Sequence, residues 1–445
     1  MRLFPLLEQV PKLPLATRQG RVSKLIGLVV ESVGPDGAIG EEMLIHGDGG
    51  RLISSEVVGF NGKKVLLMPV DSTDGVRPGM YVEGTGNLPL LSVSKSMLGR
   101  VIDPLGNPLD EGPPIQAQAR VPVNNNPPNP MKRKRIREVL STGVRVIDGL
   151  LTLGKGQRIG IFAGSGVGKS TLLGMIAKNT SADVNVIVLV GERGRELKEF
   201  VENDLGEEGL KRSVVVVATS DQTPLLRLRC ALAGTAVAEY FMHQGKDVLM
   251  MMDSVTRFAM AQREVGLSAG EPPSSRGYTP SVFALLPRLM ERAGNFEGKG
   301  SITGIYTVLV EGDDMNEPIA DTVRGILDGH IVLSRKLAGR NHYPAIDVLP
   351  SISRLFPSLA IPEQKQLCAK IRDLMAIYSD AEDLIQIGAY TRGSSPEIDQ
   401  AIQFNPKILA FLRQAVAEET GYHQTLLDMG KIFDVDLSKY LAEAT

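Results

Sequence analysis

The segment from Ala163 to Thr171 constrains the fold more than any other part of this 445-residue chain. It reads AGSGVGKST and lies between an apolar run, Ile159 to Phe162, and a helix-prone stretch that ends near Lys178. Its three glycines allow successive backbone N–H groups to turn toward a phosphate, because a Cβ atom would block close approach. The segment therefore predicts a phosphate-binding loop between a strand and a helix. A glycine-rich turn without a ligand is the weaker interpretation, since the lysine, the hydroxyl and the spacing all fit the motif.

Individual side chains of this loop have separate predicted roles. Lys169 is expected to reach the β- and γ-phosphates of a nucleotide, and the Ser170 hydroxyl is expected to hold Mg²⁺. The following helix points its positive N-terminal end at the anion. Ala163 replaces the first glycine of the usual G-x-x-x-x-G-K-[ST] pattern, and alanine is small enough to keep the loop intact. The predicted nucleotide-binding residues are Gly164, Ser165, Gly166, Val167, Gly168, Lys169, Ser170 and Thr171.

The composition disfavours several classes of protein. Lysine and arginine total 49 against 51 aspartates and glutamates, so the net charge of -2 provides no general attraction to nucleic acid. Cys230 and Cys368 have no metal-binding spacing and are expected to be reduced thiols. No apolar stretch reaches the about 18 residues that span a bilayer, and the first residues lack the pattern of a signal peptide. We expect a cytosolic protein, with peripheral attachment to a membrane machine left open.

The first hundred residues divide into a tail and a β-rich domain. Residues 1–20 carry three prolines among leucines and are expected to form a tail or a docking segment. Residues 21–99 alternate short β-type runs with turn residues, which predicts a small antiparallel barrel. The dipeptide Asn61-Gly62 predicts a hairpin, since both residues tolerate a positive φ. The strands are expected at Leu25 to Glu31, Met43 to His46, Ser54 to Phe60, Lys63 to Val70 and Met80 to Glu83.

A segment rich in proline, glycine and asparagine, residues 103–130, follows this domain. It is expected to be a linker with little regular structure that wraps the next domain, residues 100–358. The dense basic run Lys132-Arg133-Lys134-Arg135 comes directly after it. This run is interpreted as a solvated surface, and contact with nucleic acid or anionic lipid is the less favoured alternative.

Residues 141–357 alternate short apolar runs with helical patterns, whereas residues 359–445 are expected to form a helical domain. The alternation predicts an α/β architecture, in which helices cover a mostly parallel sheet and ligands bind at the carboxyl ends of strands. The expected strands are Val184 to Val190, Ser213 to Ala218, Asp247 to Met252, Ile302 to Val310 and His330 to Leu333. The expected helices are Gly194 to Leu205, Pro224 to Gln244, Ser281 to Ala293, Ile319 to Leu327, Pro362 to Ala389 and Pro396 to Ala417.

Two carboxylates end apolar runs at this expected edge of the sheet. Asp253 is predicted to be a Mg²⁺ partner, with a helix-capping aspartate as the alternative. Glu192 is predicted to orient and polarise the water that attacks a γ-phosphate. Its alternative is a surface ion pair with Arg193 or Arg195. Arg257 lies one helical turn beyond Asp253, where it either contacts phosphate or supports the region around that aspartate.

Two residues late in the α/β domain are further candidates. Tyr343 precedes a proline and offers a flat face to adenine, although a half-buried core tyrosine fits equally well. Arg354 lies beyond the last expected strand. A guanidinium supplied across a subunit boundary there would neutralise charge on the transferring phosphoryl group, and a plain surface arginine is the alternative.

Several motifs together resemble one superfamily, and the resemblance covers nearly the whole chain. Besides the phosphate-binding loop, the motifs are Gly191-Glu192-Arg193-Gly194-Arg195-Glu196, Met252-Asp253-Ser254-Val255-Thr256-Arg257-Phe258, Gly270-Glu271-Pro272-Pro273, Leu327-Asp328-Gly329-His330 and His342-Tyr343-Pro344-Ala345-Ile346-Asp347. The chain is therefore identified as similar to the rotary and secretion ATPases, and most similar to flagellar type III protein-export ATPases. The run from Phe162 to Ser170 and the run from Glu56 to Gly62 favour this branch over the virulence injectisome.

The resemblance implies a RecA-like P-loop ATPase core between an N-terminal β-barrel and a C-terminal helical domain. It also implies a homohexamer that binds ATP and Mg²⁺ at each subunit interface. The implied roles are phosphate and Mg²⁺ binding for Lys169 and Ser170, catalysis for Glu192, the Mg²⁺ side for Asp253, adenine stacking for Tyr343 and an arginine finger in trans for Arg354.

The resemblance further implies partners and a location. The segment Ala376 to Leu384, with Asp380, Glu382 and Asp383, is similar to an acidic segment that faces a central stalk protein. A regulatory dimer is implied at the N-terminal tail, together with the export gate and chaperone–substrate complexes. The implied location is the cytoplasm, peripheral at the inner membrane, and no nucleic acid is expected.

Other functions compete with flagellar protein export. An injectisome ATPase is the next interpretation, followed by a catalytic subunit of a rotary ATP synthase, an enzyme that alternates two types of subunit. A nucleotide-binding scaffold without turnover is disfavoured by Glu192. A nucleic-acid translocase is disfavoured because the expected barrel lacks the aromatic residues on which bases stack.

Overall fold

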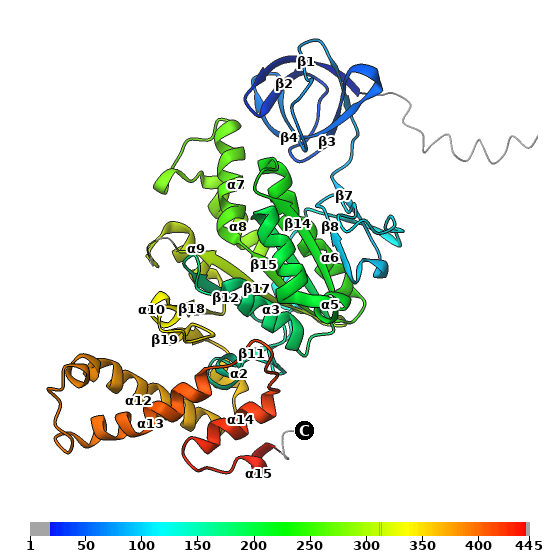
Figure 1. Ribbon diagram of the computed structural model, residues 1–445. Coiled ribbons are helices and arrows are strands. Elements are labelled where there is room, and N and C mark those ends of the chain that lie inside the picture. The colour runs from blue at the N-terminus through cyan, green and yellow to red at the C-terminus, as the bar shows by residue number, and fades with distance from the viewer. Residues whose placement is uncertain (1–17, 311, 313, 442–445) are drawn as a thin grey trace, which may run out of the picture.

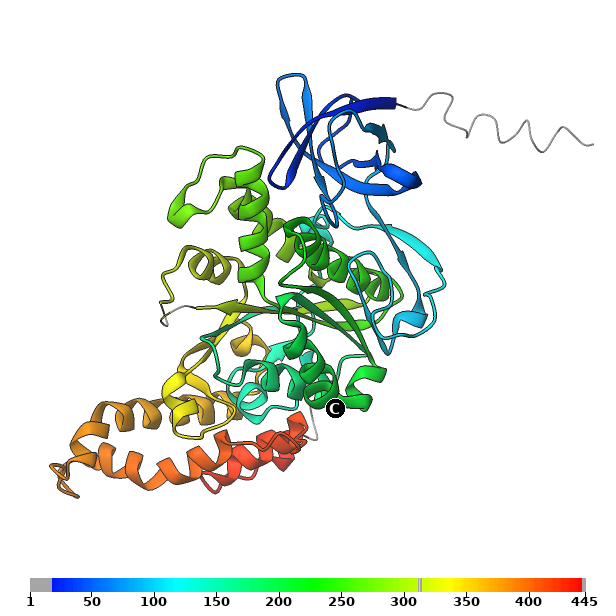
Figure 2. The same ribbon diagram turned by 45° about the horizontal axis from the view of Figure 1, so that its top comes forward.

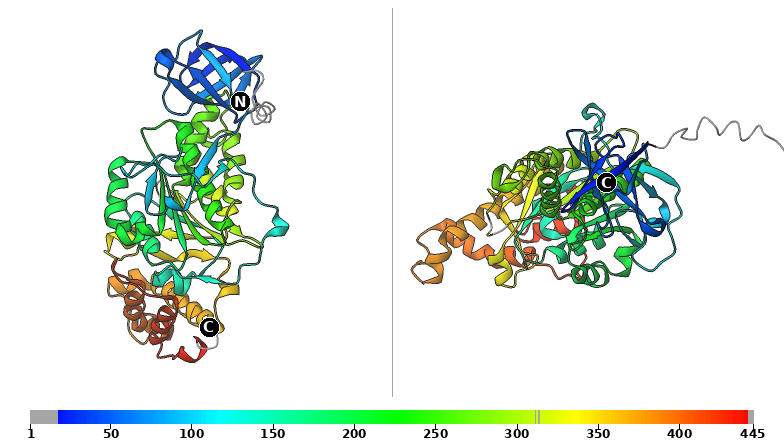
Figure 3. Two further views of the ribbon diagram at one scale, coloured as in Figure 1. Left: turned by 90° about the vertical axis from the view of Figure 1, so that its right-hand side faces the viewer. Right: turned by 90° about the horizontal axis from the view of Figure 1, so that it is seen from above.

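The computed structural model describes residues 18–310, 312 and 314–441. Three units follow one another along the molecule: a β-barrel, an α/β core and a helical domain (Figures 1 and 3). The barrel and the helical domain lie at opposite ends of the core, so the α/β sheet occupies the middle of the chain's fold. This arrangement confirms the predicted fold class.

Six antiparallel strands close the barrel in the order β1-β2-β5-β4-β3-β6. Their inward side chains form a separate apolar core that includes Val30, Ile45 and Leu67. The predicted hairpin at Asn61-Gly62 joins β4 to β5, and Gly62 has a φ of 60°. The strands are β1 (Arg18–Ile26), β2 (Val29–Val33), β3 (Glu42–His46), β4 (Leu52–Asn61), β5 (Lys64–Pro69) and β6 (Tyr81–Gly84), with a short 3₁₀ helix η2 (Asp48–Gly50).

Two details of the barrel differ from the sequence-based expectation. The single strand predicted from Leu25 to Glu31 is wrong, because the chain turns at Gly27, whose φ is 56°, and pairs back on itself as β1 and β2. The barrel also spans 18–84 rather than 21–99. Most of the predicted tail, residues 1–17, lies outside the described residues.

The connection from barrel to core has little regular structure over 103–130, as expected. Its exception is β9 (Ala119–Pro122), which pairs with β7 (Leu90–Val93). From the basic run, Arg133 donates to the Glu291 carboxylate at 2.8 Å, whereas its neighbours in that run are exposed. The remaining short elements here are η3 (Lys95–Met97), η4 (Pro130–Lys132) and the two-stranded pair β10 (Val139–Leu140) and β11 (Leu153–Gly154).

The core sheet has the strand order β19-β18-β12-β17-β15-β13-β14-β8, with β16 pairing beside β17. All neighbours along this order are parallel except the edge strand β19, which runs antiparallel to β18. The predicted strands are present, while β8 and β19 were not predicted. The strands are β8 (Arg100–Ile102), β12 (Arg158–Ala163), β13 (Val184–Glu192), β14 (Ser213–Thr219), β15 (Asp247–Asp253), β16 (Gly294–Asn295), β17 (Ser301–Leu309), β18 (Gly329–Leu333) and β19 (Ile346–Ser353).

Helices cover both faces of this sheet, as Figure 2 shows. In β13, Val186 and Val188 face one apolar core and Ile187 and Leu189 face the other, so the strand is buried on both sides. The helices of the core are α2 (Arg145–Leu150), α3 (Lys169–Asn179), α4 (Gly194–Glu199), the π-helix η5 (Phe200–Leu205), α5 (Gly206–Lys211), α6 (Pro224–His243), α7 (Val255–Ser268), η6 (Ser275–Gly277), α8 (Pro280–Met290), α9 (Pro318–Ile326), α10 (Arg335–Gly339) and α11 (Phe356–Leu359).

The last unit is helical, as predicted, and packs against the side of the core that holds α2. Its two longest helices start at prolines, which fit the first turn because their missing N–H would have no partner there. The helices are α12 (Pro362–Gln386), α13 (Pro396–Leu412), α14 (Tyr422–Lys431) and α15 (Ser438–Leu441).

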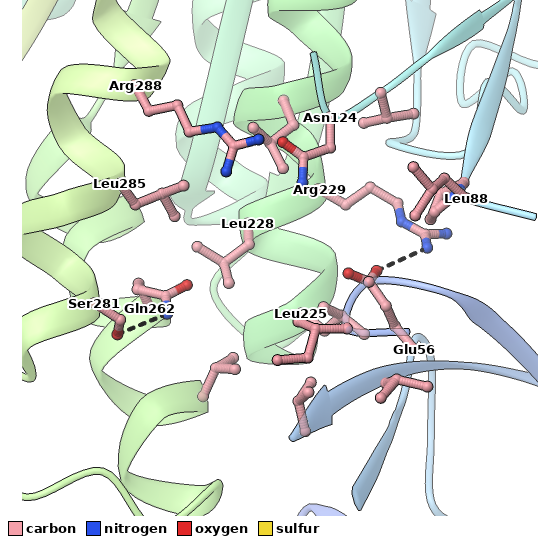
Figure 4. A pocket seen from close by; sticks show the side chains of 18 of the residues that line it. Glu56, Leu88, Asn124, Leu225, Leu228, Arg229, Gln262, Ser281, Leu285 and Arg288 are labelled. Atoms are coloured by element: carbon pink, nitrogen blue, oxygen red, sulfur yellow. Dashed lines mark hydrogen bonds and ion pairs between the residues drawn. The ribbon is translucent and has the colours of Figure 1, made fainter. Parts of the chain in front are cut away.

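A cavity of about 330 Å³ separates the barrel from the core helices α6, α7 and α8 (Figure 4). Apolar side chains such as Leu225 and Leu228 line most of it. At one side, Arg229 of α6 pairs with Glu56 of β4 at 3.2 Å, and their side chains are only 7% and 21% exposed. Burial raises the pKa of Glu56, opposed by the charge of Arg229. This ion pair ties the barrel to the core.

We expect Glu56→Ala to lower the thermal stability of the protein, because Arg229 would keep its charge in a mostly buried place without a partner. The expected loss is ~1–3 kcal/mol, measured by thermal or denaturant unfolding. The control is Asp48→Ala, which removes the partner of Arg77 in a barrel ion pair where both side chains are more than half exposed. That control should leave the midpoint of thermal unfolding nearly unchanged. An equal effect of the two substitutions would contradict the role of the Glu56–Arg229 ion pair in holding the barrel to the core.

Candidate active site

The phosphate-binding loop lies between β12 and α3, as its pattern predicts. Gly166 and Gly168 have φ values of 76° and 85°, a region that side chains with a Cβ rarely adopt. At Gly164 a Cβ would lie 2.5 Å from Arg335 Nη2, so the guanidinium of Arg335 packs closely against the start of the loop. Lys169 is the first residue of α3, so the helix N-terminus faces the space enclosed by the loop.

Asp253 ends β15 and points to the lysine of the loop. Lys169 Nζ lies 2.5 Å from Asp253 Oδ1, and the Thr307 hydroxyl donates to the same oxygen at 2.7 Å. Strand β17 stands between β12 and β15, so the ion pair spans three neighbouring strands at their carboxyl ends. The Asp253 side chain is nearly buried, which strengthens its interaction with Lys169.

Glu192 ends β13, the strand on the far side of β15. It is 8% exposed, and its Oε1 lies 3.2 Å from Arg257 Nε. Burial, followed by the nearby charge of Asp253, raises the pKa of Glu192 from 4.5 to about 7. Arg257 also donates to the Gly191 carbonyl oxygen at 2.5 Å, so it supports the turn that carries the glutamate.

The alternative pairings of Glu192 are not observed. Arg193 bonds to Glu196 and Arg195 bonds to Glu199, each within the exposed turns of α4. The Arg193 side chain is 76% exposed, so within one chain it points away from the carboxylates of the site. Glu192 instead faces Arg257, and a hydrogen bond with Glu196 of α4 adds to the rise of its pKa.

The Tyr343 ring lies beside the phosphate-binding loop. A Cβ built on Gly168 would come within 3.3 Å of Tyr343 Cε1, and the residue is 41% exposed. The open part of the ring is available to a flat ligand group next to the loop. Adenine stacking by Tyr343 therefore stays a prediction.

Arg354 lies at the opposite edge of the sheet. Gly329 pairs with Ser353 at one end of β18, and Leu333, which neighbours Ala163, is at the other. Arg354 is therefore separated from the loop of its own chain by the length of β18, which is ~13 Å for the four steps from Gly329 to Leu333 along a strand. Arg354 is exposed and lines a cavity together with Lys365. It cannot serve its own phosphate-binding loop.

Two residues of this site were not identified from the sequence. Thr307 lies near the carboxyl end of β17 and carries no motif, so only the strand order brings it to Asp253. Arg335 is the first residue of α10, two residues after the end of β18, and Ser334 between them is the N-cap of this helix. The position of a charged residue after a predicted strand was the available signal for Arg335.

The residues fit Mg²⁺ bound together with a nucleotide. Ser170 offers an exposed hydroxyl and Asp253 a carboxylate, and oxygen ligands are those that Mg²⁺ prefers. Within 18–310, 312 and 314–441, no group of three or more His, Cys, Asp or Glu residues could hold a metal ion. This agrees with the usual binding of Mg²⁺ by one or two protein groups and substrate phosphates.

Comparison with known proteins places all three units in one family. Residues 143–353 match the ATP synthase alpha/beta family, nucleotide-binding domain; residues 22–86 match its beta-barrel domain. Residues 360–431 match the T3SS EscN ATPase C-terminal domain. A flagellum-specific ATP synthase from Bacillus subtilis (strain 168) is 58% identical over 403 residues, which cover 90% of this chain and 92% of the relative.

Two solved structures are similar over the same length. The assembled ATPase EscN from the enteropathogenic E. coli type III secretion system is 44% identical, with a TM-score of 0.88. EscN in complex with its central stalk EscO is 43% identical, with a TM-score of 0.86. Each comparison covers 93% of this chain and 99% of the other.

The fold and the site together define a P-loop ATPase with a RecA-like core, an enzyme that hydrolyses ATP. No helix in the described part of the chain has the length and apolar character that crossing a bilayer requires. The chain belongs to the ATP synthase alpha/beta family, and within that family to the flagellum-specific ATP synthases.

The raised pKa of Glu192 has a measurable consequence for stability without nucleotide. Between pH 4.5 and about 7 the carboxyl is ionised in the unfolded chain but protonated in the folded one, so stability falls as pH rises through this window. Glu192→Gln has no charge to bury. We expect its thermal midpoint to exceed that of the wild type at pH 8, with a smaller difference at pH 5.5.

Thermal unfolding at the two pH values measures this difference, and Glu199→Gln on the exposed face of α4 is the control. The control should shift the midpoint equally at both pH values. A Glu192→Gln difference that does not widen with pH would contradict a buried carboxyl with a raised pKa.

Proposed function

We propose that this protein hydrolyses ATP to drive protein export through the flagellar type III secretion apparatus. The observation that carries the proposal is the gathering of Lys169, Asp253 and Glu192 at one strand edge of a chain that is 58% identical to a flagellum-specific ATP synthase. A P-loop binds the nucleotide there, and a nearly buried carboxylate is available to activate water. The site therefore has both binding and catalytic groups.

In the proposed reaction, the triphosphate competes with Asp253 for the Lys169 ammonium. The lysine then contacts the β- and γ-phosphates, which releases the Asp253 carboxylate. Asp253 and the Ser170 hydroxyl would hold Mg²⁺, which would neutralise charge on the phosphates. Glu192, when ionised, accepts a proton from the attacking water. The remaining loop residues, from Gly164 to Thr171, bind phosphate mainly through backbone N–H groups.

A second subunit completes the proposed site. Arg354 lies at the sheet edge opposite its own loop and is exposed, so it is suited to reach the nucleotide of a neighbouring copy. The solved EscN relative is an assembled ATPase. We propose a homohexamer with a nucleotide at each interface, in which each copy supplies its Arg354 to the site of a neighbour.

Partners are proposed from the relatives. EscN is solved with its central stalk EscO, so we propose a stalk protein that contacts the acidic segment from Ala376 to Leu384 here. A regulatory dimer at the N-terminal tail, an export gate and chaperone–substrate complexes complete the proposal. The tail itself, residues 1–17, lies outside the described residues. We propose peripheral attachment at the cytoplasmic face of the inner membrane.

A virulence injectisome is the second candidate setting, because the C-terminal domain matches the EscN family model and EscN is 44% identical. The higher identity of the flagellar relative, 58%, favours the flagellar apparatus. Complementation separates the two: the gene should restore motility to a mutant that lacks its flagellar ATPase, and should not restore injectisome secretion.

We expect Glu192→Gln to bind ATP with nearly wild-type affinity and to lose turnover by ~100-fold or more, because the carboxylate acts on water rather than on the nucleotide. Nucleotide titration and phosphate release measure the two properties separately. Glu199→Gln, on the exposed side of α4 where it pairs with Arg195, is the matched control and should keep its turnover. Near-normal hydrolysis by Glu192→Gln would remove this residue from catalysis.

We expect Arg354→Ala to lower turnover by ~10³-fold or more in the assembled ring, because one charge clamp on the phosphoryl group is lost. Mixing it with inactive Lys169→Ala should restore part of the activity. In such a mixture, some interfaces pair the intact loop of one variant with the intact arginine of the other. Phosphate release by the mixture at several ratios measures the rescue, and its absence would contradict supply in trans.

A further inference from the structure

The segment from Arg335 to Tyr343 contacts the phosphate-binding loop at both of its ends. The Arg335 guanidinium lies against Gly164, at the start of the loop, and the Tyr343 ring lies against Gly168, at its end. Helix α10 forms the first half of the segment and a short loop forms the rest. A shift of α10 would move Arg335 directly, and it would act on Tyr343 through the hydrogen bond from the His342 N–H to the Leu337 carbonyl oxygen.

The outer side of α10 is held by one carboxylate of the helical domain. Glu382 of α12 accepts hydrogen bonds from Lys336 Nζ at 2.7 Å and from Arg340 Nη1 at 2.6 Å. The Glu382 side chain is 12% exposed, whereas those of Lys336 and Arg340 are 63% and 50% exposed. These hydrogen bonds hold the pKa of Glu382 below its usual value, so the carboxylate is ionised at neutral pH.

The other end of the segment is held by the same domain. The Gln414 N–H donates to the Tyr343 carbonyl oxygen at 3.0 Å. The Gln414 side chain is itself fixed, because it donates to the Gly143 carbonyl oxygen at 2.8 Å and accepts from the Arg145 N–H at 2.8 Å. The adenine side of the proposed site is thus anchored to α12 at one end and to the residues after α13 at the other.

Glu382 differs in this respect from the other acidic residues of its segment. Asp380 and Asp383 are exposed, and within the described ranges their carboxylates make no hydrogen bond or ion pair. Glu382 instead turns inward to α10, where it accepts hydrogen bonds from Lys336 and Arg340. Asp383 has the same charge on the same helix and provides a matched comparison.

We propose that Glu382 is a positioning residue for nucleotide binding: it fixes α10, and through α10 it sets the place of the Tyr343 ring beside the phosphate-binding loop. The proposal rests on the function proposed above, in which Tyr343 receives adenine. It assigns the helical domain a direct part in nucleotide affinity. Groups that contact substrate equally in the ground and transition states change KM more than kcat.

The test is charge reversal at two neighbouring positions. Glu382→Lys places a third cation beside Lys336 and Arg340 and should raise the KM for ATP about five- to tenfold, with kcat changed less than about twofold. Asp383→Lys makes the same charge change at an exposed position without a partner and should leave both constants unchanged. Thermal unfolding of both variants shows whether each is folded. Equal KM values for the two variants would overturn the proposal.

Two further variants test the route through α10 and Tyr343. The double variant Glu382→Lys/Lys336→Glu restores a pair of opposite charges at these positions. It should recover at least half of the affinity for ATP that Glu382→Lys loses. In a Tyr343→Ala background, Glu382→Lys should add less than about twofold, because the ring it positions is already absent. A full additional loss there, or no recovery in the exchange variant, would contradict the proposed route.

Titration with ADP separates this proposal from the proposed function. If the wild type binds ADP but does not hydrolyse ATP, the proposed function fails, while weaker ADP binding by Glu382→Lys still supports the positioning role. If turnover is normal and Glu382→Lys binds ADP as the wild type does, the positioning role alone is wrong.

Discussion

The ion pair between Lys169 and Asp253 is the interaction on which the rest of the site depends. It joins the loop after β12 to the end of β15 across the intervening β17, and this is possible only because the three strands are parallel and end at one edge. Thr307 donates to the same carboxylate oxygen from the middle strand. The pair therefore keeps the phosphate-binding lysine and the proposed Mg²⁺ ligand in contact.

Burial supplies the chemistry of the neighbouring carboxylate. Glu192 would have an ordinary pKa on the surface, but at the end of a strand buried on both faces its charged form is poorly solvated and lies near Asp253. A pKa near 7 places the proton affinity of the group close to that needed in general-base catalysis at neutral pH. The folded state is less stable when this carboxyl is ionised, and active sites commonly combine activity with such a loss of stability.

The units at the two ends of the core contribute differently. The barrel contacts α6 through the Glu56–Arg229 ion pair, beside a largely apolar cavity and away from the nucleotide-binding loop. The helical domain instead contacts the segment that carries Arg335 and Tyr343. Substitutions in the helical domain can therefore act on the proposed nucleotide site through these direct contacts. Substitutions at the barrel contact act first on the attachment of the barrel to the core.

Elements whose causes are local could be predicted from the residues alone. The glycines of the phosphate-binding loop, the hairpin at Asn61-Gly62 and the apolar strands that end in Asp253 and Glu192 follow from backbone freedom and periodicity, so they were predicted correctly. Four features could be seen only in the folded protein. They are the strand order, the antiparallel direction of β19, the distance of Arg354 from its own loop and the inward position of Glu382. These depend on contacts between residues far apart in the chain, and neither a residue's type nor its spacing specifies which distant partner it will meet.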